Sequence, residues 1–256
     1  MVEVHVVPAL TDNYIHIIHD APHGVTAVVD PGEAGPVRAF LDARGWRLTH
    51  VLATHHHGDH IGGITDLRAD SHAPLIGPRA EMERIPEMSA TYGEGDSFTL
   101  GGQTVRVFDT PGHTRGHCAF YFEEAHLLFS GDTLFSLGCG RLFEGTPAQM
   151  WDSLLKLRPL PGDTRVYCGH EYTSGNVRFA LSIDPDNAAL KARAEEVAHL
   201  RARNLPTIPS RLSDERAANP FLRADDPDLA ARMGLAGADP ASVFAAIRKA
   251  KDDFRG

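Results

Sequence analysis

The chain has 256 residues, enough for one large domain, or a domain with an appendage, to bury a sizeable core. Its 42% hydrophobic and 23% charged residues are typical of a globular protein, and no apolar run approaches the length of a membrane span. The net charge of −9 argues against nucleic acid or an anionic membrane surface as the main partner.

The first two-thirds of the chain have the pattern of short strands with helices between some of them. Pro36 and Gly45 bracket one predicted helix, and residues 147–158 have the apolar spacing of another. Residues 118–122 and 126–130 are expected to pair as a hairpin. The predicted strands cover residues 2–7, 14–18, 26–30, 48–55, 104–110, 118–122, 126–132 and 165–171.

The character of the chain changes near residue 173. Residues 187–204 and 240–254 have strong helical propensity. Residues 187–256 carry 12 Lys+Arg against 10 Asp+Glu, whereas the remainder carries 13 against 24. This mildly basic tail is either a solvated helical surface or a source of cations for an anionic ligand. We predict an α/β fold with a strand-rich domain at 1–172 and a smaller helical domain at 173–256.

The cysteines indicate the redox compartment. Cys118, Cys139 and Cys168 are odd in number and form no C-x-x-C pair, so we expect no disulfide framework and a cytoplasmic location. The segment "MVEVHVVPAL" lacks the features of a secretory signal. A monomer is our default expectation.

Ligand-type side chains gather in short segments at or just beyond the ends of predicted strands. Strand ends on a rigid sheet can converge on one point, and imidazole with carboxylate suits zinc, iron or manganese. The string "THHHGDH" at 54–60 is the densest of these segments, and it predicts a metal site. The candidate ligands are His55, His57, Asp59, His60, His113, Asp132 and His170.

Two further histidines lie within these segments. Strand alternation turns His56 away from its neighbours His55 and His57, so we expect it to bind no metal. For His117 two roles stay open, either the support of a ligand or a purely structural one.

The segments "THHHGDH", "TPGHTRGH", "SGDTLF" and "GHEYT", in this order, resemble the metallo-β-lactamase superfamily. Within it, "GCGRLFEGT", "YCGHEYT" and "IRKAKDDF" resemble the glyoxalase II (hydroxyacylglutathione hydrolase) family over nearly the whole chain. The resemblance implies an αββα sandwich with two metals at one edge, followed by a helical substrate-binding domain. It also implies His55, His57 and His113 on one metal, Asp59, His60 and His170 on the second, and Asp132 bridging both.

The implied reaction is hydrolysis of S-(2-hydroxyacyl)glutathione, typically S-D-lactoylglutathione, to glutathione and a 2-hydroxy acid such as D-lactate, the second step of methylglyoxal detoxification. Two divalent cations, zinc first with iron or manganese as alternatives, would hold a bridging hydroxide that attacks the carbonyl carbon. Asp59 and Asp132 are the expected catalytic carboxylates, and Asp59 would accept a hydrogen bond from the hydroxide. A thiolate leaving group, with a conjugate-acid pKa of about 8.5–9, needs no dedicated general acid.

The resemblance also implies glutathione contacts at Arg141, Phe143, Tyr172, Arg248 and Lys251. Phe143 stands where some members of the family have Tyr, so that hydroxyl's hydrogen bond is missing here, and Arg141 stands where others have Lys. Alternative activities on the same fold are a lactonase or a one-metal glutathione persulfide dioxygenase. A nucleic-acid processing module is disfavoured by the net charge.

Overall fold

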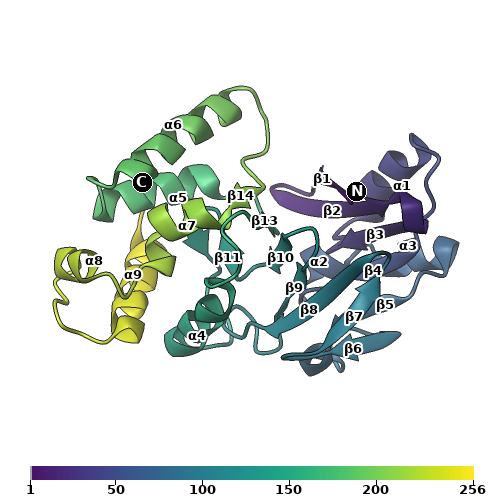
Figure 1. The fold of residues 1–256 in the computed structure, drawn as a ribbon, viewed down its shortest axis with the longest axis horizontal. Coiled ribbons are helices and arrows are strands. Elements are labelled where there is room, and N and C mark those ends of the chain that lie inside the picture. The colour runs from purple at the N-terminus through teal and green to yellow at the C-terminus, as the bar shows by residue number, and fades with distance from the viewer. Residues whose placement is uncertain (1) are drawn as a thin grey trace. The chain divides into compact units, whose positions relative to one another are not determined.

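The computed structural model describes residues 2–256, which divide into two compact units (Figure 1). The first unit comprises residues 2–109 and 116–131, and the second unit comprises residues 110–115 and 132–256. The boundary at residue 172 that the sequence suggests stays a prediction, because compactness alone divides the chain at other positions.

The first unit contains a mixed sheet in the order β1-β2-β3-β4-β5-β6, in which β1, β2 and β3 are antiparallel neighbours and β3 to β6 run parallel. Parallel neighbours require crossover connections, and α1, α2 and α3 lie in these connections. The strands are β1 (Glu3–Ala9), β2 (Asn13–Asp20), β3 (Val25–Val29), β4 (His50–Leu52), β5 (Leu75–Pro78) and β6 (Ala90–Tyr92).

The helices of the first unit are short. α1 and α3 contribute apolar side chains to the same core as the first five strands, including Val37, Leu41 and Leu67. The elements are η1 (Ala21–His23), α1 (Ala34–Asp42), α2 (Gly58–Ile61), α3 (Ile64–Ser71) and η2 (Arg79–Glu81).

Four more strands of the first unit form an antiparallel series in the order β7-β8-β9-β10. The predicted hairpin of β9 and β10 is confirmed, with Phe122 opposite Leu127. Both of its strands are buried throughout, as their continuous apolar runs require. These strands are β7 (Ser97–Leu100), β8 (Gln103–Asp109), β9 (Cys118–Phe122) and β10 (Leu127–Gly131).

The second unit is mainly helical after β13. Several of its helices begin at well-formed caps: Thr146 and Gln149 make a capping box on α4, and Asp239 accepts a hydrogen bond from the Ser242 backbone on α9. Its elements are β11 (Leu134–Phe135), β12 (Gly138–Cys139), α4 (Pro147–Leu157), β13 (Arg165–Cys168), α5 (Thr173–Ile183), α6 (Ala188–Ala202), β14 (Ser210–Arg211), α7 (Leu212–Ala218), η3 (Pro220–Leu222), α8 (Pro227–Arg232) and α9 (Pro240–Asp253).

Aromatic side chains hold the second unit's helices together. Phe244 of α9 lies 6.0 Å from the ring of Trp151 on α4 and 5.8 Å from that of Phe221 in η3. Phe179 of α5 lies 6.0 Å from Phe221. Such pairs stabilise packing by about 0.5–1.5 kcal/mol each beyond the burial of their area. α5 and α9 are thereby fixed by one core.

The strand positions predicted from the sequence are confirmed, with ends that differ by at most three residues. The predicted helix at 36–45 begins earlier, at Ala34, because Pro36 is tolerated anywhere in a first turn and does not have to open it. Gly45 lies beyond the helix in a left-handed conformation. Within residues 2–256, no helix combines the length and the apolar character needed to cross a membrane.

Candidate metal centre and substrate site

The histidine-rich segment directly follows β4 and then forms the four-residue helix α2, which carries Asp59 and His60. Because β4 lies between β3 and β5, its carboxyl end is at the centre of the sheet edge. His55 is 0% exposed and His60 is 1% exposed. Two imidazoles buried to this degree need strong partners.

The donor atoms of this segment lie close to one another. His55 Nε2 is 3.1 Å from His57 Nδ1, and His60 Nε2 is 3.5 Å from Asp59 Oδ2. The rings of His55 and His60 are 4.2 Å apart. Imidazole nitrogens gathered beside a carboxylate are the donor set that a borderline cation such as Zn²⁺ prefers.

Asp30 orients this group from the end of the neighbouring strand β3. Its carboxylate accepts hydrogen bonds of 2.7 Å from both the backbone N–H and the hydroxyl of Thr54, and its Oδ2 lies 3.0 Å from His60 Nδ1. Asp30, His55 and His60 could themselves hold a cation, since each offers a ligand atom within 4.8 Å of the others. With Asp30 already bound to Thr54, we assign it the role of fixing His60, which leaves Nε2 as the nitrogen of this ring that could bind a metal.

Asn13, at the start of β2, holds Asp59. Its side-chain amide donates to Asp59 Oδ2 at 2.9 Å and approaches the Asp59 carbonyl oxygen at 3.2 Å. Asn13 is buried. A carboxylate that accepts a hydrogen bond from a buried amide has one preferred orientation, which is what a metal ligand or a catalytic acceptor requires.

The second unit presents a separate group centred on Asp132. Asp132 Oδ2 lies 3.3 Å from His113 Nε2 and 3.3 Å from His170 Nε2. All three side chains are buried. A single carboxylate oxygen equally distant from two imidazole nitrogens is well placed to share cations with both rings, so these donors fit divalent metal.

The two histidines around Asp132 are each oriented by a neighbour. His113 Nδ1 lies 2.9 Å from the carbonyl oxygen of Arg141, which leaves Nε2 facing the carboxylate. The ring of His170 stacks on that of Tyr172 at 4.7 Å with an angle of 4°. Phe143 packs against His113 at 5.2 Å and is 64% exposed. The structure therefore brings Tyr172 and Phe143 next to candidate metal ligands.

Gly140 and Gly138 allow the loop after β11 to pack closely. A β-carbon on Gly140 would stand 1.9 Å from the carbonyl oxygen of Asp132, and one on Gly138 would stand 2.4 Å from the Asn176 side chain. Because both positions lack a side chain, the loop can pack directly against the backbone of Asp132 and against α5.

His56 and His117 lie at the margin of the first unit's group. His56 Nδ1 is 2.9 Å from Glu81 Oε2, so this ring binds a carboxylate of η2. The ring of His117 lies 4.9 Å from that of His55 and is buried. Its place behind His55 favours the supporting role.

Arg248, on α9, is 5% exposed and held by its own unit. One nitrogen donates to the carbonyl oxygen of Cys139 at 3.0 Å and the other donates to Asp252 at 2.8 Å. The guanidinium also lies 5.1 Å from the centre of the Phe221 ring. Arg248 thus ties α9 to the loop that supplies Arg141.

Lys251 and Arg141 lie beside the same carboxylate. Lys251 Nζ donates to the carbonyl oxygen of Gly175 at 2.9 Å, and Arg141 Nε lies 3.9 Å from Asp252 Oδ1. Partial burial, followed by the positive charges of Arg248, Arg178 and Arg141, lowers the pKa of Lys251 to about 8. This crowding of cations is suited to an anionic ligand.

The three cysteines are free and buried, which confirms the expectation of no disulfide. Burial raises the pKa of the Cys139 thiol to about 11 and that of Cys168 to about 12. At neutral pH both stay protonated and unreactive.

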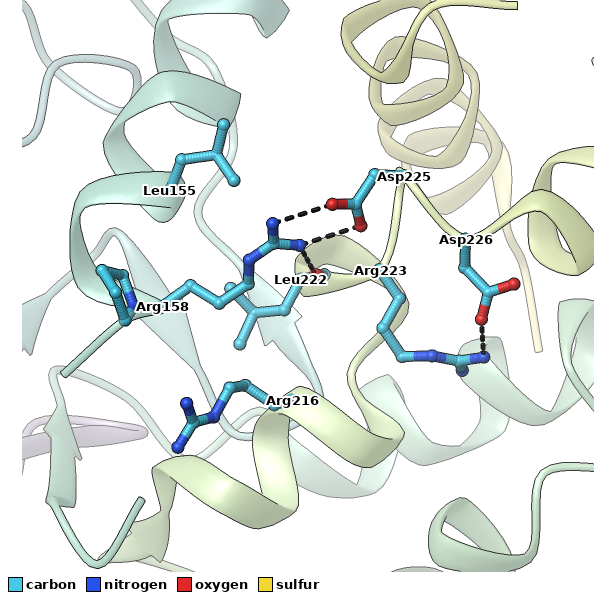
Figure 2. A pocket seen from close by; sticks show the side chains of 8 residues that line it. Leu155, Arg158, Arg216, Leu222, Arg223, Asp225 and Asp226 are labelled. Carbon is cyan, nitrogen blue, oxygen red and sulfur yellow. Dashed lines mark hydrogen bonds and ion pairs between the residues drawn. The ribbon is translucent and has the colours of Figure 1, made fainter. Parts of the chain in front are cut away.

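A cavity of about 520 Å³ lies elsewhere in the second unit, beside the end of α4 and η3 (Figure 2). Arg158 donates to both carboxylate oxygens of Asp225, at 2.8 and 2.7 Å, and to the carbonyl oxygen of Leu222. Arg223 pairs with Asp226 on the other side. The cavity contains none of the predicted site residues, and its ion pairs fix α4 to the chain before α8.

Sequence reasoning missed Asn13, Asp30, Arg178 and Asp252. Asn13 in "TDNY" and Asp30 in "VVDPG" have the sequence pattern of ordinary turn residues. Asp252 has the pattern of a solvated charge on a helix. Only the strand order brings Asp30 beside Thr54, and only the packing of α5 and α9 brings Arg178 near Lys251.

Two family models match adjoining parts of the chain. Residues 15–170 match the metallo-beta-lactamase superfamily, and residues 171–254 match the C-terminus of hydroxyacylglutathione hydrolase. The hydroxyacylglutathione hydrolase of Methylococcus capsulatus (strain ATCC 33009 / NCIMB 11132 / Bath) is 53% identical over 256 residues and is matched over 100% of both chains.

Solved structures show the same α/β fold. The BLEG-1 B3 metallo-beta-lactamase has a TM-score of 0.65 at 22% identity, with 86% of this chain and 99% of that chain covered. TTHA1623, in a di-iron-bound form, has a TM-score of 0.55 at 27% identity, with 64% of this chain and 90% of that chain covered. The chain belongs to the hydroxyacylglutathione hydrolase family of the metallo-β-lactamase superfamily.

Proposed function

We propose that this protein is a dimetal thioesterase that hydrolyses S-(2-hydroxyacyl)glutathione, with S-D-lactoylglutathione as the typical substrate. Water is consumed, the thioester C–S bond breaks, and glutathione and a 2-hydroxy acid are released. The observation that carries the proposal is Asp132 Oδ2, which lies 3.3 Å from a nitrogen of both His113 and His170. The match of the chain to the family over its full length supports the same activity.

The family and the histidine and aspartate groups indicate a binuclear metal site. We assign its ligands by the family pattern: His55, His57 and His113 would hold one metal, Asp59, His60 and His170 would hold the second, and Asp132 would contribute to both. Zinc is our proposal for the metal, because imidazole nitrogen dominates the donor set.

When bound, two divalent cations supply hydroxide at neutral pH and a Lewis acid for the carbonyl oxygen. The chain's own residues fix the direction of attack. Asp59, held by Asn13, can accept a hydrogen bond from the attacking water, and Asp30 keeps His60 in one tautomer. Tyr172, 41% exposed and stacked on His170, can donate its hydroxyl to the substrate.

The glutathione moiety is assigned to the second unit, at Arg141, Phe143, Tyr172, Arg248 and Lys251. The cations around Lys251 favour binding of the two carboxylates of glutathione. The exposed ring of Phe143 offers the ligand an apolar contact but no hydroxyl group. We further propose a domain boundary at residue 172, which the two family models support by meeting between residues 170 and 171. We propose a cytoplasmic location because the cysteines are free. We propose a monomer by default, and size-exclusion chromatography tests this oligomeric state.

The test is the release of free thiol from S-D-lactoylglutathione by purified protein whose bound metal has been counted. We expect turnover with two metal ions per chain. A fully metallated protein that releases no thiol would overturn the proposal, and parallel assays with a lactone and with glutathione persulfide would then identify either alternative activity.

A further inference from the structure

Arg178 lies on α5, five residues before its end, and its side chain is exposed. Across residues 2–256 the structure gives it no hydrogen bond and no ion pair. Its positive charge nevertheless lowers the pKa of Lys251, so the two side chains share one electrostatic environment. Arg178 is therefore a cation that the fold places near other cations without a counter-charge of its own.

The neighbouring cations differ from Arg178 in this respect. Arg248 donates to Asp252 at 2.8 Å, and Arg141 lies 3.9 Å from the same carboxylate. Lys251 donates to the carbonyl oxygen of Gly175. Arg248, Arg178 and Arg141 all lower the pKa of Lys251, and Asp252 is the carboxylate that opposes them. Like charges at this density repel one another, and an incoming anion relieves that repulsion.

Gly175 leaves open the place between Arg178 and Lys251. A β-carbon at Gly175 would stand 3.8 Å from Arg178 Nη2 and 3.9 Å from Lys251 Nζ, the two nearest atoms outside the adjoining backbone. The two nitrogens therefore flank one point at which the chain has no side chain. A carboxylate lying over Gly175, between these two nitrogens, could accept hydrogen bonds from both, with the guanidinium as a fork and the ammonium as a point charge.

We propose that Arg178, together with Lys251 across Gly175, binds a carboxylate of the glutathione moiety. The inference rests on the proposed function and adds a specificity residue to it. Glutathione has one carboxylate at its glycyl end and one at its γ-glutamyl end, and both have the chemistry that this pair recognises. Arg248, which the proposed function also places at the glutathione moiety, is buried and bonded to Cys139 and Asp252, whereas Arg178 is exposed and has no protein partner among residues 2–256 to give up.

The first test compares Arg178→Ala with wild type on S-D-lactoylglutathione. Because the contact is made equally in ground and transition states and the side chain is exposed, KM should rise about threefold to tenfold with kcat unchanged. Arg178→Lys keeps the positive charge but lacks the forked guanidinium, so its KM should lie between those of wild type and Arg178→Ala. Arg211→Ala is the matched control, since Arg211 is also exposed in the second unit and is not among the cations that perturb Lys251.

Two substrate analogues separate a direct contact from a structural effect. One carries an ethyl ester on the glycyl carboxylate, and the other carries N-acetyl in place of the γ-glutamyl residue, which also prevents acyl transfer to a free cysteine amine. The KM penalty of Arg178→Ala should disappear with the analogue that lacks the carboxylate bound by Arg178. An equal penalty with all three substrates would overturn the inference.

Gly175→Ala provides a second variant that tests the space between the two cations. The methyl group makes only ordinary van der Waals contacts, and alanine in a helix is more stable than glycine by roughly 0.5–1 kcal/mol, so the fold is retained. We expect KM to rise while the melting temperature does not fall. If both Gly175→Ala and Arg178→Ala have the KM of wild type, the inference is overturned and the proposed function is unaffected. If metallated wild type shows no turnover, the proposed function is overturned.

Discussion

The side-chain amide of Asn13 donates a hydrogen bond of 2.9 Å to Oδ2 of Asp59, which lies 46 residues further along the chain. One residue of a β-hairpin thereby orients a carboxylate of the short helix α2. In the proposed metal centre Asp59 is both a ligand and a hydrogen-bond acceptor for water. Its orientation consequently depends on a residue that touches neither metal nor substrate.

We expect Asn13→Ala to weaken binding of the second metal by about 10- to 100-fold, as is typical when the support of a ligand is removed. Asn13→Asp should weaken it further, because two carboxylates would face each other at hydrogen-bond distance. Metal content after dialysis against a chelator of graded strength measures the effect. If Asn13→Ala retains two metal ions per chain as tightly as wild type, Asp59 does not depend on this contact.

Asp132→Ala should remove bound metal and activity together, because it deletes the carboxylate that is proposed to be shared by the two metals and that lies beside His113 and His170. The matched control is Asp152→Ala, which removes an exposed carboxylate from α4 and should change neither. Elemental analysis and thiol release are measured on the same samples. A variant lacking Asp132 that still binds two metal ions would show that the bridging assignment is wrong.

Lys251 should impose an alkaline limit on substrate binding. Its pKa of about 8 means that the ammonium is charged at pH 7 and loses its proton as the pH rises past 8, so attraction for a carboxylate falls and kcat/KM declines. The charged groups around it are Arg248, Arg178, Arg141 and Asp252. Removing one positive charge with Arg178→Ala should raise the pKa and move the decline to higher pH.

Lys251→Arg provides the control for this pH dependence. A guanidinium stays protonated throughout the range, so kcat/KM should stay level between about pH 7.5 and 9.5. The uncatalysed alkaline hydrolysis of the thioester is subtracted at each pH. An identical decline in wild type and Lys251→Arg would show that another group titrates.

Arg158→Ala should destabilise the second unit without affecting catalysis. The guanidinium makes two hydrogen bonds with Asp225, and its loss should lower the free energy of unfolding by about 1 kcal/mol, since both groups are partly exposed. Arg158 lowers the pKa of Asp225, so the stabilisation is present above the ordinary carboxyl value of 3.8 and is lost at lower pH. Urea denaturation at pH 7 measures it, with Arg211→Ala as the control; equal midpoints would contradict the assignment.

The sequence was sufficient to predict those features of the fold and the site that depend on residues close together along the chain. "THHHGDH" follows a short apolar strand, and that strand is β4, with His55 and His60 buried directly after it. The hairpin at 118–130 was predictable because both strands are continuous apolar runs with a polar turn between them. Charge spacing on the last helix placed Arg248 and Lys251 together, and they lie on α9.

Contacts between segments that are distant along the chain could not be predicted from the sequence. Asn13 and Asp59, or Arg178 and Lys251, meet only after strands pair and helices pack, and no local spacing encodes this. Nor could the sequence distinguish two kinds of arginine in the helical region after residue 172. Arg248 is bonded internally, whereas Arg178 is exposed and unpaired among residues 2–256.

The most direct test of the account is steady-state hydrolysis of S-D-lactoylglutathione by the purified protein, with bound metal counted in the same sample. Efficient thiol release with two metal ions per chain is the predicted result. A protein that carries two metal ions per chain and releases no thiol from this substrate would contradict the account.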